Sequence, residues 1–397
     1  MPEKDQERCP CPFKTCALIM TTNASAFEYG AELQGRGEPT TKDIVIGSFM
    51  FLCASSAVIL GVLNIYLIKR MDIFHNAFGW FWASRTLGEV VNNLLHVLYS
   101  APVTIMQPSG ISPYFGILVF LLGYLCAFGS CIMHQVVSLN RCIAVCCPIA
   151  YKFIFTKETC KKVILAVWIP VPFIISLYVI LPCNLIGYSP QLYEYAFIKC
   201  SPNMDREYSL LGTIINRTCA VLCCFTVLTD FVTLCRIIYI RKVLKMRAQN
   251  ADFNRDIRFF AQTTVQNLTM IAAVAMIAIA NNEFRLEDEV LHVLGFNTLL
   301  VTHVNNALAL LVFNPEIRHR FRRCFKRVAG NLFGRDTTIA SAVVEPLLTH
   351  GLSNFVTIYG VIIEVLLVVI IVYVPGIRFI MGAAPPPVEA SAFWVLY

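Results

Sequence analysis

Few side chains that could carry chemistry interrupt the apolar stretches of this chain. Arg85 and Glu89 lie four residues apart in one stretch, and Asp230 lies in another. Side chains at this spacing meet on a helix, so Arg85 and Glu89 can form an ion pair that lowers the cost of either charge in lipid. Two interpretations of the pair remain open: a polar face toward a bundle interior, or an ordering contact near a membrane edge. No nucleophile, metal site or phosphate loop has a spacing usable for catalysis, so we predict neither enzymatic activity nor a cofactor.

The composition requires a nonpolar environment. Hydrophobic residues make up 57% of the 397 residues, Asp, Glu, Lys and Arg make up 14%, and the mean hydropathy is +0.65. Soluble domains carry roughly 25% charged residues. These values exclude a secreted disulfide scaffold, a basic nucleic-acid reader and an ordinary cytosolic enzyme. We therefore expect contact with membrane lipids and no nucleic-acid partner.

Apolar runs long enough to cross a lipid bilayer recur along the chain. A bilayer core of ~30 Å requires about 20 apolar residues in a helix, and only helices and closed barrels satisfy every backbone polar group there. Seven runs qualify, at residues 44–68, 77–99, 113–137, 163–181, 210–239, 257–280 and 290–313. We predict an all-α integral membrane protein, folded as a seven-transmembrane helix bundle.

The positions of Lys and Arg predict the orientation of these spans. The connections on one side of the bundle hold 21 of these residues, and the N-terminal segment and the other connections hold eight. By the positive-inside rule the N-terminus lies outside and the basic segment after span seven is cytoplasmic. We divide the chain into an extracellular N-terminal segment (1–43), a receptor-sized seven-transmembrane domain (44–325) and a C-terminal tail (326–397).

The segments expected outside carry candidate modification sites. Asn23 begins an Asn-Ala-Ser sequon, which would be glycosylated in the lumen, although short sequons also arise by chance. Five of the 17 cysteines lie outside, and two of these, Cys183 and Cys200, bracket the fourth connection. A disulfide between them would stabilise the loop by roughly 3 kcal/mol, and two free thiols are the alternative. The pairing of the other three outer cysteines stays open.

A spaced set of residues marks the cytoplasmic side. Arg141 closes the apolar run of span three, and Pro148 follows seven residues later. In and after span seven, Asn306 and Asn314 lie eight residues apart, with Arg318 shortly beyond. This order and spacing resemble the rhodopsin-like G-protein-coupled receptors. Those receptors carry an Asp-Arg-Tyr motif, a seventh-span Asn-Pro-x-x-Tyr motif and a short amphipathic eighth helix.

Departures from the rhodopsin-like pattern narrow the family. Asn140 replaces the acidic residue before Arg141, Cys142 replaces the tyrosine, and Gly116 stands where most such receptors have a cysteine. The chain instead resembles the nematode serpentine receptor class x chemoreceptors over roughly residues 44–325. The shared features lie in five places along the chain. They are Asn76, Phe78, Gly79 and Ser84-Arg85 at the start of span two, Ser-Leu-Asn-Arg at 138–141 with Pro148, the loop bracketed by Cys183 and Cys200 with tyrosines between them, Thr233 near the end of span five, and Phe-Asn-Pro-Glu-Ile-Arg at 313–318.

The resemblance implies a chemosensory receptor of the plasma membrane, in sensory-neuron cilia, that binds a small external ligand and activates a heterotrimeric G protein. In such receptors the span-three arginine contacts the G protein when span six swings outward, and Arg141 matches it. Asn140, Cys142 and Pro148 complete the expected coupling site. Since Asn140 carries no charge to hold Arg141 at rest, Asp256 at the mouth of span six is the expected restraint.

The expected ligand pocket lies in the outer third of the bundle. At about 1.5 Å per residue, Tyr124 and Phe120 are ~26 to 32 Å from Arg141 along span three. Rhodopsin-like receptors bind small ligands at this depth. His96 and Phe296 are expected beside them, although a lone buried histidine is more often a hydrogen-bonded core residue. Which ligand is bound cannot be derived from these residues.

Two features follow span seven. Residues 318–327 mix phenylalanines with cations, which suits an amphipathic juxtamembrane helix on anionic lipid, and Cys324 is a palmitoylation candidate. Residues 355–374 form another apolar run, interrupted by Glu364. Three interpretations of this run remain open: an eighth span, an interfacial or reentrant segment, or downstream sequence joined wrongly in the gene model.

An ion channel and a transporter are two functional classes that could also have seven spans. A ligand-gated seven-span sensory ion channel would present a polar ring in one span, and the polar residues of span two are sparse for that purpose. A small transporter would show repeated halves or paired broken helices, and no such repetition is evident. The channel is the alternative that we retain.

Overall fold

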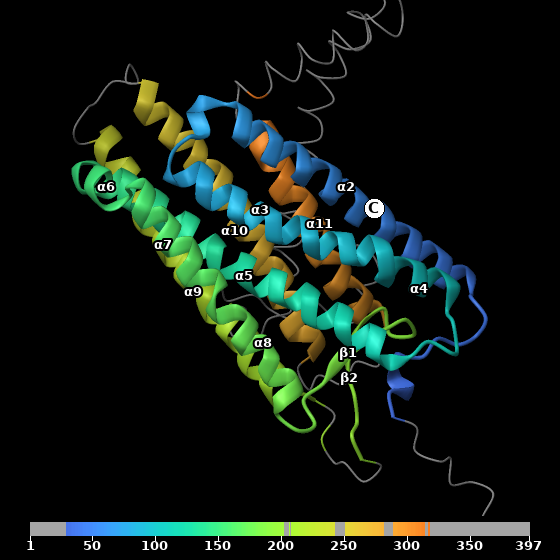
Figure 1. The fold of residues 1–397 in the computed structure, drawn as a ribbon. Coiled ribbons are helices and arrows are strands. Elements are labelled where there is room, and N and C mark those ends of the chain that lie inside the picture. The colour runs from blue at the N-terminus through green and yellow to red at the C-terminus, as the bar shows by residue number, and fades with distance from the viewer. Residues whose placement is uncertain are drawn as a thin grey trace, which may run out of the picture.

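The computed structural model describes residues 29–201, 206, 208–242, 251–281, 289–313 and 317 (Figure 1). Seven helical rods run alongside one another in this part of the chain. They are α2 (Thr41–Arg70), α3 with α4 (Ala77–Leu95 and Ala101–Met106), α5 (Pro113–Cys146), α7 with α8 (Lys157–Trp168 and Pro170–Ile180), α9 (Leu210–Lys242), α10 (Ala251–Asn281) and α11 (Glu289–Phe313). Each predicted span coincides with one rod.

The shorter elements lie between and beyond the rods. They are η1 (Ala31–Leu33), η2 (Asp72–Phe74), a π-helical turn (His96–Ser100), α6 (Pro148–Ile154) and the strands β1 (Ile186–Ser189) and β2 (Glu194–Phe197). The two strands form an antiparallel hairpin at the end of the bundle opposite α6 (Figure 1). We call these the hairpin end and the α6 end.

The helices begin where the sequence supplies caps. Thr40 and Asp43 form a capping box, in which each side chain accepts a hydrogen bond from the other residue's backbone N–H. The Asn76 side chain caps α3, and Thr156 caps α7. Prolines occupy the first turns of α5, α6 and α8. Backbone N–H groups in a first turn have no intrahelical acceptor, so the N–H that proline lacks costs no hydrogen bond there.

The distribution of side chains is that of a membrane protein. Four helices among the described residues are long and apolar enough to cross a bilayer: Thr41–Arg70, Pro113–Cys146, Lys157–Ile180 and Leu210–Ile240. Large apolar side chains such as Leu52 and Ile59 point outward, 64% and 67% exposed. Charged and amide side chains of α3 are instead buried in the interior, as lipid requires.

The second rod extends beyond its predicted end at Tyr99. The helix passes through the π-helical turn His96–Ser100 and continues as α4 to Met106. Pro102 lacks a backbone N–H and cannot continue the ordinary helical bonding pattern, and a π turn is one way in which a helix absorbs such an interruption. The prediction ended the span too early because it followed hydrophobicity alone.

The indole of Trp168, the last residue of α7, packs against both α3 and α5. Its Nε1 donates to the Ser84 hydroxyl oxygen over 2.8 Å. A Cβ added to Gly129 would lie 2.6 Å from the Trp168 ring, and one added to Gly88 would lie 2.8 Å from it. The two glycines therefore provide the space that the indole fills.

The predicted disulfide is confirmed. Cys183 and Cys200 are joined, with their Cα atoms 5.5 Å apart, and the bond closes the loop that contains the hairpin. The strands pair Tyr188 with Tyr195, so both rings are presented at the hairpin end of the bundle.

Candidate functional site

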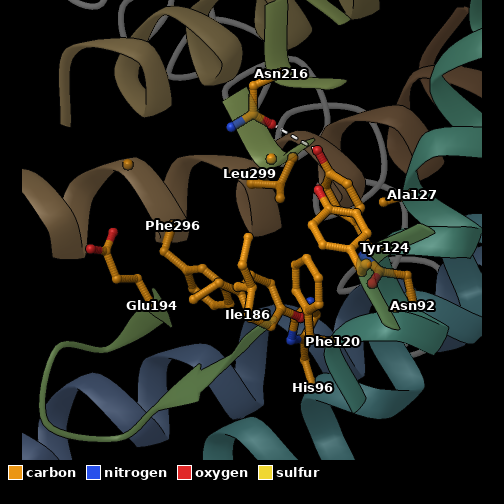
Figure 2. A pocket seen from close by; sticks show the side chains of 15 residues that line it. Asn92, His96, Phe120, Tyr124, Ala127, Ile186, Glu194, Asn216, Phe296 and Leu299 are labelled. Atoms are coloured by element: carbon orange, nitrogen blue, oxygen red, sulfur yellow. Dashed lines mark hydrogen bonds between the residues drawn. The ribbon is translucent and has the colours of Figure 1, made fainter. Parts of the chain in front are cut away.

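A cavity of about 160 Å³ lies under the hairpin, where α3, α5, α8, α9 and α11 converge (Figure 2). Its lining residues come from all five helices, the π-helical turn and both strands. They are Asn92, His96, Phe120, Gly123, Tyr124, Ala127, Tyr178, Ile186, Glu194, Tyr195, Gly212, Asn216, Gly295, Phe296 and Leu299. The structure thus brings together the four residues that the sequence nominated, His96, Phe120, Tyr124 and Phe296. That they bind a ligand remains a prediction.

Aromatic rings form most of the cavity wall. Phe120 stacks on Tyr124 with 5.1 Å between ring centroids and meets Tyr195 edge to face at 5.0 Å. Phe296 meets the rings of His96 and Tyr195 at 5.3 and 5.5 Å. Rings held in this way present a preformed apolar surface with defined faces and edges.

A few polar groups face the same cavity. The Tyr124 hydroxyl donates to Asn216 Oδ1 over 2.7 Å, which links α5 to α9 (Figure 2). His96 Nδ1 lies 3.1 Å from the Ser100 hydroxyl, and its Nε2 has no hydrogen-bond partner in the described part of the chain. The Asn92 side chain, 2% exposed, likewise makes no hydrogen bond among the described residues.

Asp43 fastens the hairpin over this end of the bundle. Its buried carboxylate accepts hydrogen bonds from the Tyr193 hydroxyl at 2.7 Å, from Gln107 Nε2 at 2.9 Å and from Arg36 at 2.9 Å. Tyr193 has a φ of 58°, a left-handed conformation that costs a non-glycine residue strain and is held by its surroundings. Burial and the hydrogen bond to Asp43 raise the pKa of Tyr193, so the hydroxyl stays protonated and donates.

A network of charged and amide groups lies deeper in the bundle. Arg85 Nε and Glu89 Oε1 are 3.3 Å apart, and the two side chains are 1% and 10% exposed. Arg85 Nη1 lies 2.8 Å from His134 Nδ1 on α5, and Asn306 of α11 donates to Glu89 over 2.8 Å. Gln266 of α10 donates to the Asn306 carbonyl over 2.7 Å. The ion pair therefore faces the bundle interior and connects four rods.

A second polar contact joins α5, α9 and α10 nearer the α6 end. The Ser138 hydroxyl donates to Asp230 Oδ1 over 2.8 Å, and the Asn267 amide donates to the other oxygen of the same carboxylate. The isolated acidic residue of span five is thus buried and hydrogen-bonded.

Arg141 lies at the α6 end of α5 and is 4% exposed. Its guanidinium carbon is 3.6 Å from the centroid of the Phe78 ring, a cation–π contact with the start of α3. Asn140 is fully buried, with its Nδ2 3.5 Å from the Tyr151 hydroxyl of α6. Phe78 was selected from the sequence only as part of the family motif and not as a partner of Arg141, since the contact joins two helices far apart in the chain.

The comparisons with known proteins decide the family. A family model described as serpentine type 7TM GPCR chemoreceptor Srx matches residues 51–314. The chain belongs to the Srx family. The crystal structure of squid rhodopsin is similar, with a TM-score of 0.59 and 12% sequence identity, over 72% of this chain and 86% of that one. At this identity the likeness concerns the fold. No curated protein matches the chain.

Family and fold make this Srx protein a multi-pass membrane receptor of the G-protein-coupled class, with a rhodopsin-like seven-helix bundle. The family resemblance and the fold class inferred from the sequence are confirmed. Squid rhodopsin is itself a protein of this fold, so the match supports the assignment of the seven rods as the seven spans.

The other nominated residues are placed as follows. Cys142 lies on α5 with its Sγ 3.9 Å from Cys146 Sγ, and Pro148 begins α6. Asn306 lies in α11 within the polar network. Asp256 belongs to α10, but its side chain is outside the described residues. Also outside them are Asn23, Asn314, Arg318, Cys324, the juxtamembrane segment 318–327 and the run 355–374.

Some lining residues were missed from the sequence. Tyr178 and Tyr195 come from span four and the hairpin, for which no inward face was predicted. Asn216 lies within an apolar run, and the sequence alone did not mark it as a ligand contact. A polar residue at the outer half of a span was the available signal for Asn216, whereas only the tertiary structure identifies the two tyrosines.

Proposed function

We propose that this Srx protein is a chemosensory receptor that binds a small external ligand in the cavity and activates a heterotrimeric G protein. The observation that carries the proposal is the course of α5, which contributes Phe120 and Tyr124 to the cavity and Arg141 to the opposite end. The Arg85–Glu89 network contacts the same helix between these points through His134. A ligand that shifts α5 or its neighbours would therefore act on Arg141.

In this proposal Arg141 is the G-protein contact. At rest its guanidinium lies over Phe78. When α10 moves outward, the guanidinium is released and donates to carbonyls of the last helix of the G protein. Asn140, Cys142 and Pro148 shape this end of α5, and Asn306, Asn314 and Arg318 belong to the adjoining seventh-span motif.

Two restraints on Arg141 follow, one from Phe78 and one from Asp256. A cation–π contact contributes about 0.5–2 kcal/mol, so Phe78→Leu should raise basal nucleotide exchange by about two- to thirtyfold. Asp256→Ala should also raise basal nucleotide exchange if the Asp256 carboxylate holds Arg141 at rest. Unchanged basal nucleotide exchange in a normally expressed Asp256→Ala variant would show that Asp256 does not restrain Arg141.

The orientation places the hairpin end outside and the α6 end in the cytosol of the plasma membrane. The 21 basic residues that the sequence has in the segments after spans one, three, five and seven, and the disulfide in the hairpin loop, support this orientation. The N-terminal segment would then carry glycan on Asn23, and sensory-neuron cilia are the expected location. An epitope placed after Arg327 should be stained only in permeabilised cells, and staining of intact cells would refute the orientation.

Residues 318–327 would lie on the inner leaflet as an amphipathic helix in contact with anionic lipid. Palmitate on Cys324 would add a second anchor. Labelled palmitate should be incorporated by the unaltered chain and lost in Cys324→Ser, whereas persistence of the label would move the modification to another cysteine.

The experiment that separates receptor from ion channel records both activities of the same expressed chain. We expect guanine-nucleotide exchange on a heterotrimeric G protein, and no membrane current that persists when G-protein signalling is blocked. A ligand-gated current without nucleotide exchange would favour the channel instead.

A further inference from the structure

The size of the cavity limits the ligand to a single ring. Its volume is about 160 Å³. An engineered apolar protein cavity of about 150 Å³ binds benzene, whereas pockets for drug-sized ligands occupy roughly 300–1,000 Å³. A benzene-sized molecule with one or two small substituents therefore fills the space, and two fused rings do not enter without displacing the wall.

The wall selects an aromatic ligand over an aliphatic one of equal size. The Tyr195 ring meets Phe120 and Phe296 edge to face, with interplanar angles of 69° and 70°. This geometry is the one that aromatic pairs prefer, worth about 0.5–1.5 kcal/mol per pair beyond burial. A flat ring inserted among them gains such contacts, which a saturated ring lacks.

The charges around the cavity favour an uncharged ligand. Among the described residues that line the cavity there is no Lys or Arg, so these residues offer a carboxylate no counter-charge. Glu194 is an acidic residue of this described lining, and Figure 2 shows it on the far side of Phe296 from Tyr124. An ammonium group among the rings would therefore lie apart from this carboxylate.

Two polar groups remain for the ligand to satisfy. Asn92 makes no side-chain hydrogen bond among the described residues, and neither does Nε2 of His96. Both residues line the cavity from the same rod, one turn apart. A buried imidazole nitrogen without a partner is costly, so a ligand atom that hydrogen-bonds His96 Nε2 gains affinity, and the Asn92 amide offers a further donor and acceptor in the cavity wall.

We propose that the cavity binds an uncharged molecule with one aromatic ring and one hydroxyl or carbonyl group, which hydrogen-bonds Asn92 or His96. The inference rests on the proposed function only in taking this cavity as the ligand site. A hydroxyl group both donates and accepts, so it suits either tautomer of His96 and either end of the Asn92 amide.

The test uses the full chain purified into lipid nanodiscs and 4-methylphenol as the probe. We expect it to bind at least tenfold more tightly than benzylamine, benzoate, 4-methylcyclohexanol or 2-naphthol at pH 7. Ala127→Leu fills the cavity and should weaken binding at least tenfold, whereas Ala220→Leu on α9, outside the lining, should not. Tighter binding of any of the other four compounds, or equal binding by both variants, would overturn the proposal.

A second comparison keeps the test decisive if Ala127→Leu does not fold. Toluene has the same ring and methyl group as 4-methylphenol but no hydroxyl. The preference for 4-methylphenol over toluene should fall at least fivefold in the double variant Asn92→Ala/His96→Phe, while toluene affinity changes less than twofold. An unchanged preference would show that Asn92 and His96 do not hydrogen-bond the hydroxyl of 4-methylphenol.

Nucleotide exchange on a G protein, measured on the same preparation, distinguishes failure of the proposed ligand class from failure of the proposed receptor function. Exchange that depends on Arg141, without binding of 4-methylphenol, would refute the ligand class and leave the receptor proposal standing. Binding of 4-methylphenol without any exchange would refute the proposed function and leave the ligand class standing.

Discussion

Arg85 and Glu89 form an ion pair in the least favourable place for charge, the interior of a membrane protein. The pair is buried, and each member has a further partner on another rod, His134 for Arg85 and Asn306 for Glu89. Desolvation offsets much of the attraction between such charges, so the pair adds little net stability. Its effect is to require that α3, α5 and α11 keep one relative arrangement.

Removing one member of this pair should destabilise the protein more than removing both. Glu89→Gln leaves the Arg85 guanidinium buried without a counter-charge, at a cost of about 3–5 kcal/mol. The double variant Arg85→Met/Glu89→Gln removes the charge and should recover most of the loss. Thermal unfolding in detergent measures both. A double variant less stable than Glu89→Gln would contradict this account of the pair.

At the scale of the elements, the packing of α7 against α5 depends on space for the indole of Trp168. Gly129→Ala would place a Cβ 2.6 Å from the Trp168 ring, so the ring or a helix must shift. Overpacking of this kind costs about 1–3 kcal/mol. The apparent melting temperature should fall in Gly129→Ala and stay unchanged in Gly110→Ala, since a Cβ at Gly110 meets nothing within 4 Å. Equal effects at both glycines would refute the packing argument.

The hairpin is a second element, and the hydrogen bond from Tyr193 to Asp43 is one of several contacts that position it. Tyr193→Phe keeps the ring but removes the hydroxyl that donates to Asp43. Amide hydrogen exchange of residues 186–197 should become faster by about fivefold, the equivalent of roughly 1 kcal/mol. Tyr208→Phe, at an exposed tyrosine beyond the hairpin, is the matched control. Unchanged exchange in Tyr193→Phe would mean that the disulfide and the other hydrogen bonds of the hairpin hold it without this hydroxyl.

The spans, the disulfide and part of the cavity could be predicted because each has a signal local in sequence. Length and hydrophobicity predict spans, and counting along one helix predicts the depth of Phe120 and Tyr124. Whether a residue on a helix lines the cavity depends on how that helix is rotated about its axis, and this rotation has no local signal in the sequence. In lipid, the outward face of a helix such as α2 is as apolar as its packed face, so periodicity does not identify the inward side. Tyr195 reaches the cavity from a hairpin that only long-range contacts position.

At the scale of the whole molecule, the two ends of the bundle differ in chemistry. The hairpin end has an aromatic cavity closed by a disulfide-bonded loop, and the α6 end has a buried arginine among basic connections. Polar networks centred on Glu89 and Asp230 join the rods between these ends. This arrangement suits transmission of a small movement along the bundle, because interior hydrogen bonds must be exchanged and cannot simply be stretched.

The measurement that tests the account most directly is loading of a non-hydrolysable GTP analogue onto a panel of heterotrimeric G proteins in membranes that contain the chain. We predict faster loading of at least one G protein than in membranes without the chain. That excess should be lost in Arg141→Ala and retained in Arg217→Ala, which removes an exposed arginine of α9. Loading that is no faster with the chain, or that is equally fast in Arg141→Ala, would contradict the proposal that this receptor acts on G proteins through Arg141.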